Sequence, residues 1–534
     1  MPFSGKTFVQ CLWIGAVLAG GRGAPTVDDA AAAADPASPN SPSSDEAAAP
    51  ERAAPVGPEL SRSRPCVCLD RYKKIQCGEA LRTNTADARY FRFEIICEPL
   101  SSGEPLRQLY GSLRAAAPEA EFVISIQGLS MNEMPARFLS GVKALIVHLN
   151  TSAVQSFDPA AFEGLATRVL DLKSLAAVPP PLEAIRRIPK LGTLMLHGFH
   201  LEVVSRGLFP ESLTTLGLSS CGVRRVEADA LPRGLVILNL NGNRELTAGG
   251  LANAFQHMSR LRTLMLKDTS VNSFTKDTFS GLKNLISLYL VNCNIKQLGN
   301  DVFSTLPKLD ALYLGQNSLR HFGFMLGTNV SNLSVDDNNL TALDEDLFER
   351  LGARRLRSLN LSNNGFAEVP HALRHLSQLT SLSLAGNHIG KLNWSALNAL
   401  RKLRTLEIGH NELITIEGSP DLPDLWSLDL SGNLLEDLQG TLKTLRLGKL
   451  ELTGNRFEKL SLDEFPTTLR SIKLEGKQKY AYVSYRPGRV FPAFRYLYLF
   501  MQILHCVVSI ALHCDCSLVF AGVRASACAP GASS

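Results

Sequence analysis

Hydrophobic residues recur along this chain in a short, fixed pattern. Seven segments match L-x-x-L-x-L-x-x-N/C-x-L closely, and they begin at residues 261, 285, 309, 356, 379, 403 and 425. Weaker copies begin at residues 121, 144, 167, 191, 213, 235, 330, 447 and 469. The sixteen copies are spaced by 21 to 26 residues, which indicates a repeat solenoid.

The alternating L-x-L predicts a short strand in each copy. Its leucines are buried, while the third, fifth and seventh positions of the repeat face a concave surface. The ninth position can satisfy backbone groups where the chain leaves the strand. Asparagine fills it in eight of the sixteen copies: Asn243, Asn317, Asn338, Asn364, Asn387, Asn411, Asn433 and Asn455. Cys221 and Cys293 take this place in two copies, which favours buried residues of the asparagine row over reactive thiols or a mutual disulfide.

The second half of many copies carries a phenylalanine, as in FLSGV, AFEGL, TFSGL, VFSTL and LFERL. One copy cannot bury its own apolar side, but stacked copies form a continuous core. We therefore predict an α/β solenoid, a curved horseshoe with a parallel concave sheet, about 16–17 repeats and disulfide caps. The seventeenth copy is FRYLYLFMQIL at residue 494, so the predicted repeats span 121–504.

The N-terminal residues predict export. Lys6, an apolar stretch and small residues near position 20 have the layout of a signal peptide over 1–23, and a retained signal anchor is the alternative. Residues 24–64 are rich in Ala, Pro and Ser, and they are predicted to be a disordered spacer. Ten cysteines remain after Cys11, including two end clusters. An oxidising environment makes these disulfide candidates: Cys66, Cys68, Cys77, Cys97, Cys506, Cys514, Cys516 and Cys528.

The repeat pattern resembles the extracellular leucine-rich repeat family, in its 24-residue subclass with slit-type proteins, small proteoglycans and Toll-like receptor ectodomains. Residues 65–120 resemble its cysteine-rich N-terminal flank through the C-x-C-x8-C portion, although a usual earlier cysteine is absent. Residues 505–534 resemble a partial C-terminal flank through HCDCSL. A looser similarity is to secreted arthropod repeat proteins like the non-catalytic subunit of a shrimp luciferase. The family implies recognition of protein partners.

The C-terminal apolar run, residues 496–512, is 17 residues long and contains Gln502 and His505. A membrane span needs about 20 apolar residues, so a closing repeat and cap is the favoured interpretation and a membrane anchor the weaker one. Cys514-Asp515-Cys516 is read as part of that cap and not as a metal site.

We find no enzyme motif in the sequence and predict a non-enzymatic protein that has no cofactor and no metal. The net charge of +5 is weak for a chain of 534 residues, so nucleic acid is not an expected partner. His371 and His375 are interpreted as solvated histidines because further zinc ligands are not near them in sequence.

Binding is therefore predicted on the concave face. Met265, Tyr289 and Tyr313 occupy the fifth position in consecutive copies, with Lys267 beside them. Tyr and Met are favoured at interface cores, and cross-strand packing is the alternative role. Glu407, Asp429 and Glu451 form an acidic row further on, interpreted as a solvated face. The N-glycosylation candidates are Asn150, Asn329, Asn332, Asn339, Asn360 and Asn393.

The leading hypothesis is a secreted protein-binding solenoid with an extracellular or cell-surface protein ligand. Glycans at Asn332 and Asn360 would direct that ligand toward repeats before about residue 320. The alternatives are a membrane-anchored receptor or adhesion ectodomain, and an accessory subunit of an extracellular enzyme.

Overall fold

The computed structural model describes residues 66–70, 92–321, 323, 329–351, 355–461, 464–474, 482–484, 518–520 and 523–525. Several predictions lie outside these residues: the signal peptide and spacer, the seventeenth copy and apolar run, and the cysteines Cys77, Cys506, Cys514, Cys516 and Cys528.

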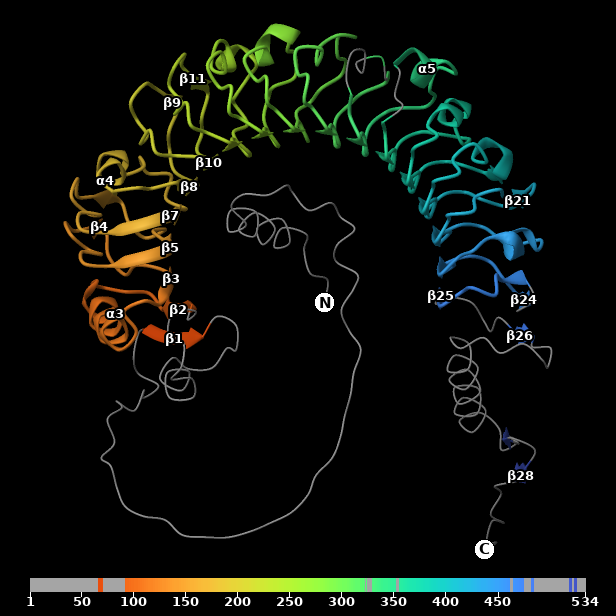
Figure 1. The fold of residues 1–534 in the computed structure, drawn as a ribbon, viewed down its shortest axis with the longest axis horizontal. Coiled ribbons are helices and arrows are strands. Elements are labelled where there is room, and N and C mark those ends of the chain that lie inside the picture. Colours follow the sequence, from red (N-terminus) through yellow and green to blue (C-terminus); the bar gives the residue numbers. More distant parts are fainter. Residues whose placement is uncertain are drawn as a thin grey trace, which may run out of the picture. The chain divides into compact units, whose positions relative to one another are not determined.

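Each of the sixteen predicted copies contributes one strand to a single parallel sheet (Figure 1). The strands are β3 (Glu121–Ile126), β5 (Lys143–Asn150), β7 (Ala166–Lys173), β8 (Thr193–His197), β10 (Thr215–Ser219), β12 (Ile237–Asn239), β13 (Thr263–Met265), β14 (Ser287–Tyr289), β15 (Ala311–Tyr313), β16 (Asn332–Ser334), β17 (Ser358–Asn360), β18 (Ser381–Ser383), β20 (Thr405–Glu407), β22 (Ser427–Asp429), β23 (Lys449–Glu451) and β25 (Ser471–Lys473). Like positions stack, since Leu264 is the register partner of Leu288. The predicted parallel solenoid is confirmed.

Short elements connect the strands on the outer side of the repeats (Figure 1). The paired outer strands are β4 (Glu133–Met134) with β6 (Ser156–Phe157), β9 (Val203–Val204) with β11 (Arg225–Val226), β19 (Lys391–Asn393) with β21 (Thr415–Glu417), and β24 (Lys459–Ser461) with β26 (Tyr482–Ser484). The helices there are α4 (Leu182–Arg186), α5 (Leu347–Leu351), and the 3-10 helices η3 (Gly249–Leu251), η4 (Lys276–Phe279), η6 (His371–His375), η7 (Trp394–Ala396) and η8 (Thr441–Thr444). Separately, β27 (Leu518–Phe520) pairs antiparallel with β28 (Val523–Ala525).

The core is the continuous stack that the repeat pattern predicts. The fourth- and sixth-position leucines, such as Leu264 and Leu266, have no exposed surface. The phenylalanines of successive copies touch, and Phe274 packs against both Phe279 and Phe303 with ring centroids 5.1 and 5.9 Å away. Each such side chain contributes roughly 1.5–3 kcal/mol by leaving water, and only neighbouring copies make that burial complete.

The asparagine row ties each turn to the one before it. Asn317 Nδ2 donates to the carbonyls of Leu290 and Leu314, both at 2.8 Å. Its Oδ1 accepts from the backbone N–H groups of Cys293 and Ile295 at 2.9 and 3.0 Å. Backbone groups that the short strand leaves unpaired are thereby satisfied inside the core. The predicted role of the ninth-position asparagines is confirmed.

Cys221 and Cys293 are free and buried, as predicted. The Cys293 thiol donates to the Leu266 carbonyl at 3.0 Å, and the Cys221 thiol donates to the Leu196 carbonyl at 3.4 Å. Burial raises the pKa of Cys221 to about 12 and also raises the pKa of Cys293, so both are neutral thiols at physiological pH.

An antiparallel strand and a helix close the N-terminal end of the sheet. β1 (Cys66–Asp70) pairs antiparallel with β2 (Arg92–Cys97), which pairs in parallel with β3. Cys66 and Cys97 form a disulfide, and Cys68 is disulfide-bonded as well. Helix α3 (Glu104–Ala116) follows β2, and its Tyr110 hydroxyl donates to the Lys143 carbonyl at 2.9 Å. The end strand of the apolar stack is thereby covered.

Candidate functional site

The predicted aromatic ladder lies on three neighbouring strands. Met265 ends β13 and is the register partner of Tyr289 on β14, which is the partner of Tyr313 on β15. The two tyrosine rings are stacked, with centroids 4.3 Å apart and planes inclined by 9°. All three side chains are half-buried. The in-register stacking of fifth positions thus joins them into one surface.

Lys267 lies two residues after Met265 and is exposed, so it adds a cationic side chain near that surface. Its backbone N–H donates to Asn241 Oδ1 at 2.8 Å, which fixes the chain at this position. Burial raises the pKa of Tyr289, and so does the adjacent Tyr313. The Tyr289 hydroxyl therefore remains protonated at neutral pH. The ladder offers apolar ring surface, hydroxyl groups and one positive charge.

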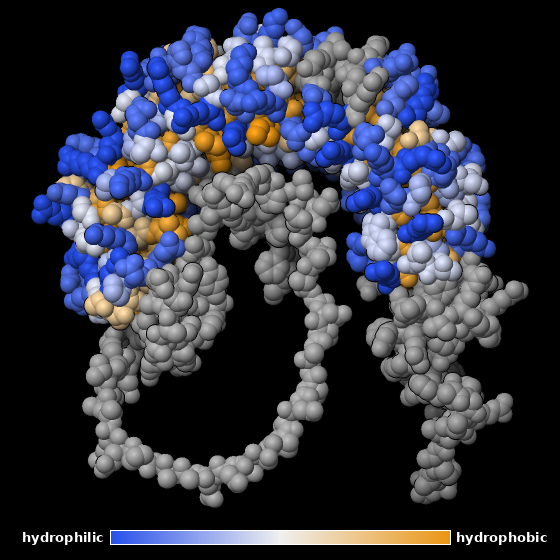
Figure 2. Space-filling model, viewed as in Figure 1, coloured by the Kyte–Doolittle hydropathy of each residue, from blue (hydrophilic) through white to orange (hydrophobic). Residues whose placement is uncertain are grey.

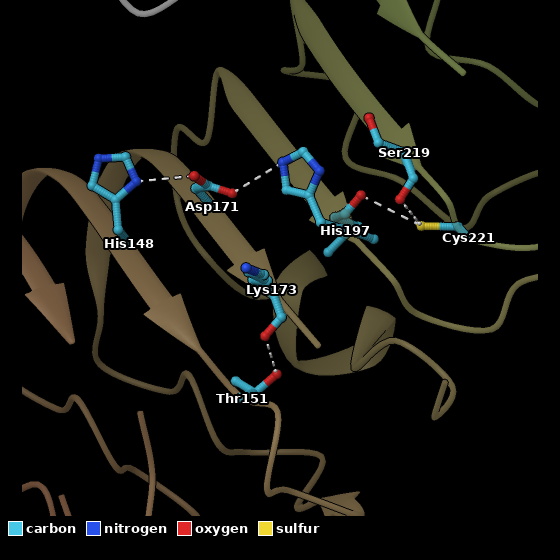
Figure 3. A network of polar contacts seen from close by, with 8 residues as sticks. His148, Thr151, Asp171, Lys173, His197, Ser219 and Cys221 are labelled. Carbon is cyan, nitrogen blue, oxygen red and sulfur yellow. Dashed lines mark hydrogen bonds and ion pairs between the residues drawn. The ribbon is translucent and has the colours of Figure 1, made fainter. Parts of the chain in front are cut away.

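A second cluster lies on β5, β7 and β8 (Figure 3). Asp171 lies between two histidines, with His148 Nδ1 3.0 Å from Oδ2 and His197 Nε2 3.4 Å from Oδ1. Burial lowers the pKa of His197, and the positive charge of Lys173 lowers it further, while Asp171 acts in the opposite direction. About a quarter of the His197 and Asp171 side chains is exposed, 26% each. The polar side chains of this cluster therefore pair mainly with one another.

The sequence pattern did not single out this cluster. His148 and Asp171 occupy the fifth positions of adjacent copies, so the sequence could have indicated a contact between a histidine and an acid there. His197 is a seventh-position residue, and its approach to Asp171 depends on the register between β7 and β8.

The acidic row lies on β20, β22 and β23, where Glu407, Asp429 and Glu451 are register partners. Asp429 Oδ1 accepts from the backbone N–H of Ser431 at 2.8 Å. Lys473 Nζ lies 3.1 Å from the Glu451 carboxylate and forms an ion pair with it. Two of the three carboxylates therefore have local partners.

The glycosylation candidates differ in exposure. Asn329, Asn339 and Asn393 are exposed, whereas Asn150, Asn332 and Asn360 are half-buried. Asn332 and Asn360 lie on β16 and β17, directly after the tyrosine strands. In three of the sequons the asparagine oxygen accepts from the backbone N–H and hydroxyl of the serine two residues on: Asn150 with Ser152, Asn360 with Ser362, and Asn393 with Ser395.

None of the helices in the described part of the chain has the length and apolar character that crossing a bilayer requires. Within the same residues, no three His, Cys, Asp or Glu side chains are grouped as ligands for a metal ion. Polar residues cover the outer rim of the repeats, and apolar residues come to the surface nearer the strands (Figure 2).

Sixteen stacked turns, eight of them with a buried ninth-position asparagine, define a repeat solenoid. The sequence model of the family described as "Leucine rich repeat" matches residues 233–295, 328–389 and 377–435. These matched segments are leucine-rich repeats, and the same spacing runs through the other turns of the sheet.

Mouse podocan-like protein 1 is 28% identical over 397 residues, covering 67% of this chain and 63% of the relative. Human vasorin is 37% identical over 97 residues, 18% of this chain and 14% of that protein. The chain thus spans less than two thirds of the length of either relative. These matches support the extracellular group of the family, whereas the looser similarity to a luciferase subunit is not confirmed by them.

A solved complex of TLR13 with the RNA ssRNA13 has 20% identity and a TM-score of 0.46, and the match covers 68% of this chain and 65% of TLR13. The expectation that nucleic acid is not a partner rests on the charge balance alone.

Proposed function

We propose that the chain is a secreted, non-enzymatic solenoid that binds an extracellular or cell-surface protein through its concave face. Its role would be recognition, adhesion or matrix contact. The observation that carries the proposal is the stacked pair Tyr289–Tyr313, continued by Met265 and flanked by Lys267. Tyrosine is enriched among hot-spot residues, and methionine is enriched at the cores of protein interfaces.

Cross-strand packing alone would also stack two tyrosines. A binding role is favoured for two reasons. The rings are only half-buried, and the fold does not require an aromatic residue at the fifth position. The same position holds Gly217 and Ser383 in other turns of the sheet. The ladder is therefore an addition to the repeat and not a part of its core.

The sequons support a boundary for this surface. Asn332 on β16 is the register partner of Ala311 on β15, one strand beyond the tyrosines. A glycan at Asn332 would cover the face next to Tyr313 and leave the side toward Met265 open. The Cys66–Cys97 disulfide is a further support for export, because such bonds persist in oxidising compartments.

Full-length protein carrying a C-terminal tag tests the location. Expression in secreting cells should place the tag in the medium. A tag found only in membranes would contradict secretion and favour the membrane-anchored alternative.

A photo-crosslinking residue in place of Tyr313 tests the surface. It should capture a protein from native extracellular fluid, and the double substitution Tyr289→Ala with Met265→Ala should abolish that capture. Glu407→Ala, another fifth-position change on the same sheet, is the matched control and should leave capture intact. Equal capture by both variants would remove the tyrosine ladder from the proposal, and capture of an enzyme would favour the accessory-subunit alternative.

A further inference from the structure

An exposed tryptophan lies on the edge of the sheet, outside the concave face. Trp426 immediately precedes β22, Gly448 precedes β23, and Arg470 precedes β25. The residues that follow them, Ser427, Lys449 and Ser471, are register partners. Trp426, Gly448 and Arg470 are therefore side by side on three consecutive turns, at the second position of the repeat.

Gly448 makes room for the Trp426 side chain. A Cβ atom at Gly448 would lie 2.1 Å from Cζ2 of the indole, so only glycine permits the ring to rest on this backbone. The Arg470 guanidinium carbon lies 5.2 Å from the ring centre, within the range of a cation–π contact. The indole is thus held in place by its neighbours, yet 45% of the tryptophan remains exposed.

The indole forms one wall of a hollow of about 670 Å³ that the two following turns complete. Its lining includes Pro423, Asp424, Trp426, Arg446, Thr467 and Arg470. A hollow of this volume is in the range of small-ligand sites.

The charges in the hollow favour an anionic ligand. Arg446 and Arg470 are both exposed, and neither forms an ion pair within the described residues. Asp424 is the single acid among the lining residues. Two guanidinium groups without carboxylate partners match carboxylate or sulfate geometry, because each presents a planar fork of N–H donors.

We propose that this hollow binds an anionic saccharide that carries sulfate or carboxylate groups. The apolar C–H face of a sugar ring would stack on the exposed indole of Trp426. Arg446 and Arg470 would pair with the anionic substituents, and the Thr467 hydroxyl is available for a sugar hydroxyl. The choice of a saccharide over a phosphorylated peptide rests on the proposed extracellular function, since sulfated and uronate sugars belong to that space.

Titration of the full-length secreted protein with a heparin hexasaccharide tests the proposal. Trp426→Ala and Arg446→Ala should each weaken binding about tenfold, as expected for the loss of one stacking or charge-assisted contact. Arg357→Ala is the matched control, because Arg357 is an exposed second-position arginine on a distant turn, and it should not change the affinity. Unchanged affinity in both test variants would overturn the proposal.

Three further measurements keep the result interpretable. Trp394 is fully buried, so acrylamide quenching of the mature protein reports mainly on Trp426, and the hexasaccharide should protect it. Trp426→Phe retains an aromatic ring and should keep most of the affinity if stacking is the contact. A desulfated hexasaccharide should bind at least tenfold more weakly, and equal binding would contradict the role of the arginines.

The two proposals fail separately. Hexasaccharide binding is measured on the purified protein and does not involve Tyr289 or Tyr313. Crosslinking at Tyr313 reports on the protein ligand and does not involve Trp426. A secreted protein that crosslinks normally but ignores the hexasaccharide would reject only the saccharide site.

Discussion

The turns before residue 235 and the turns after it share one spacing but secure their strand ends in different ways. In the earlier turns β5 and β7 run for eight residues, and β8 and β10 for five. In the later turns β12, β15 and β23 each run for three. Backbone bonds join neighbouring turns beyond the strand ends in both regions, and the later turns add a buried asparagine side chain to them.

The side chains at the strand exits differ accordingly. Thr151 and Ser174 are buried exit residues in the earlier turns, where Thr151 Oγ1 donates to the Lys173 carbonyl at 3.1 Å. In the later turns Asn317 and its equivalents contact both their own turn and the previous one. A hydroxyl has a single donor hydrogen, while a primary amide has two donor hydrogens and a carbonyl oxygen with two lone pairs, so the amide can serve more backbone groups at once.

Backbone pairing continues past the strand ends in the later turns as well, since the Leu290 N–H donates to the Tyr313 carbonyl at 2.8 Å and the Asn292 N–H to the Gly315 carbonyl at 3.0 Å. The asparagine side chain adds to this pairing by satisfying groups that lie beyond it. The earlier strands remain paired through their seventh positions, which brings Lys173 into register with His197. The longer strands β5, β7 and β8 carry the polar cluster of Figure 3, whereas the aromatic ladder lies on the three-residue strands β13, β14 and β15.

The largest loss of stability is expected from a substitution in the asparagine row. Asn317→Leu should destabilise the protein by about 3 kcal/mol or more, because it leaves several buried backbone groups unpaired at about 1–3 kcal/mol each. Urea unfolding followed by circular dichroism measures the loss. Ser174→Ala is the control in the earlier turns, since the Ser174 hydroxyl accepts one backbone bond from Ala176 at 3.2 Å. It should cost about 1 kcal/mol, and equal losses would contradict the comparison.

The next effect concerns the eighth position. Gly198 has φ +73°, and a Cβ there would lie 2.1 Å from the Ser174 carbonyl oxygen. Gly432 has φ +64°, and its Cβ would meet the His410 side chain instead. Gly198→Ala should therefore cost more than the roughly 1–2 kcal/mol of a left-handed alanine, and Gly432→Ala about that amount.

Thermal melts of both variants measure the difference. Gly207→Ala is the control for backbone strain alone, because Gly207 has φ +78° and nothing within 4 Å of its Cβ position. A Gly198→Ala variant as stable as Gly207→Ala would show that the earlier turns yield at this contact.

The spacing of leucines predicted all sixteen strands because burial of fourth- and sixth-position side chains is a property of each copy by itself. The Met265, Tyr289 and Tyr313 ladder followed for the same reason, since like positions stack. Contacts between unlike positions could not be predicted. His197 meets Asp171 only through the register of two strands, and the Cys66–Cys97 pairing depends on an antiparallel strand that the repeat spacing does not encode.

A smaller effect is expected from pH. Burial lowers the pKa of His197, with Lys173 adding to this, so the folded state binds the proton less readily than the unfolded chain does. Stability should therefore fall as the pH drops through the unfolded pKa of about 6.5 toward the lower folded value. Chemical denaturation at pH 7.5 and pH 5.5 measures the change, which should be smaller than that of Gly198→Ala.

The matched variant for this measurement is His197→Asn. It should show less loss of stability between the two pH values than the unchanged protein. An equal loss in both would assign the pH dependence to other groups.

The smallest effect is expected in chemical labelling of the two buried thiols. Cys221 lies in the earlier turns and Cys293 in the later ones. Because burial raises the pKa of Cys221 to about 12 and raises that of Cys293, neither should react with iodoacetamide at pH 8 in the native protein.

Repeat solenoids open locally, so low urea should expose the thiols at different rates. Peptide mass spectrometry measures both sites in one sample, with Cys221→Ser and Cys293→Ser as assignments of the signals. An asparagine of the next turn accepts from the backbone N–H of both cysteines, Asn243 from Cys221 and Asn317 from Cys293. Slower labelling of Cys293 is expected because its thiol makes the shorter hydrogen bond, 3.0 Å to the Leu266 carbonyl against 3.4 Å from Cys221 to the Leu196 carbonyl. Equal rates at every urea concentration would mean that the two kinds of turn open as one unit.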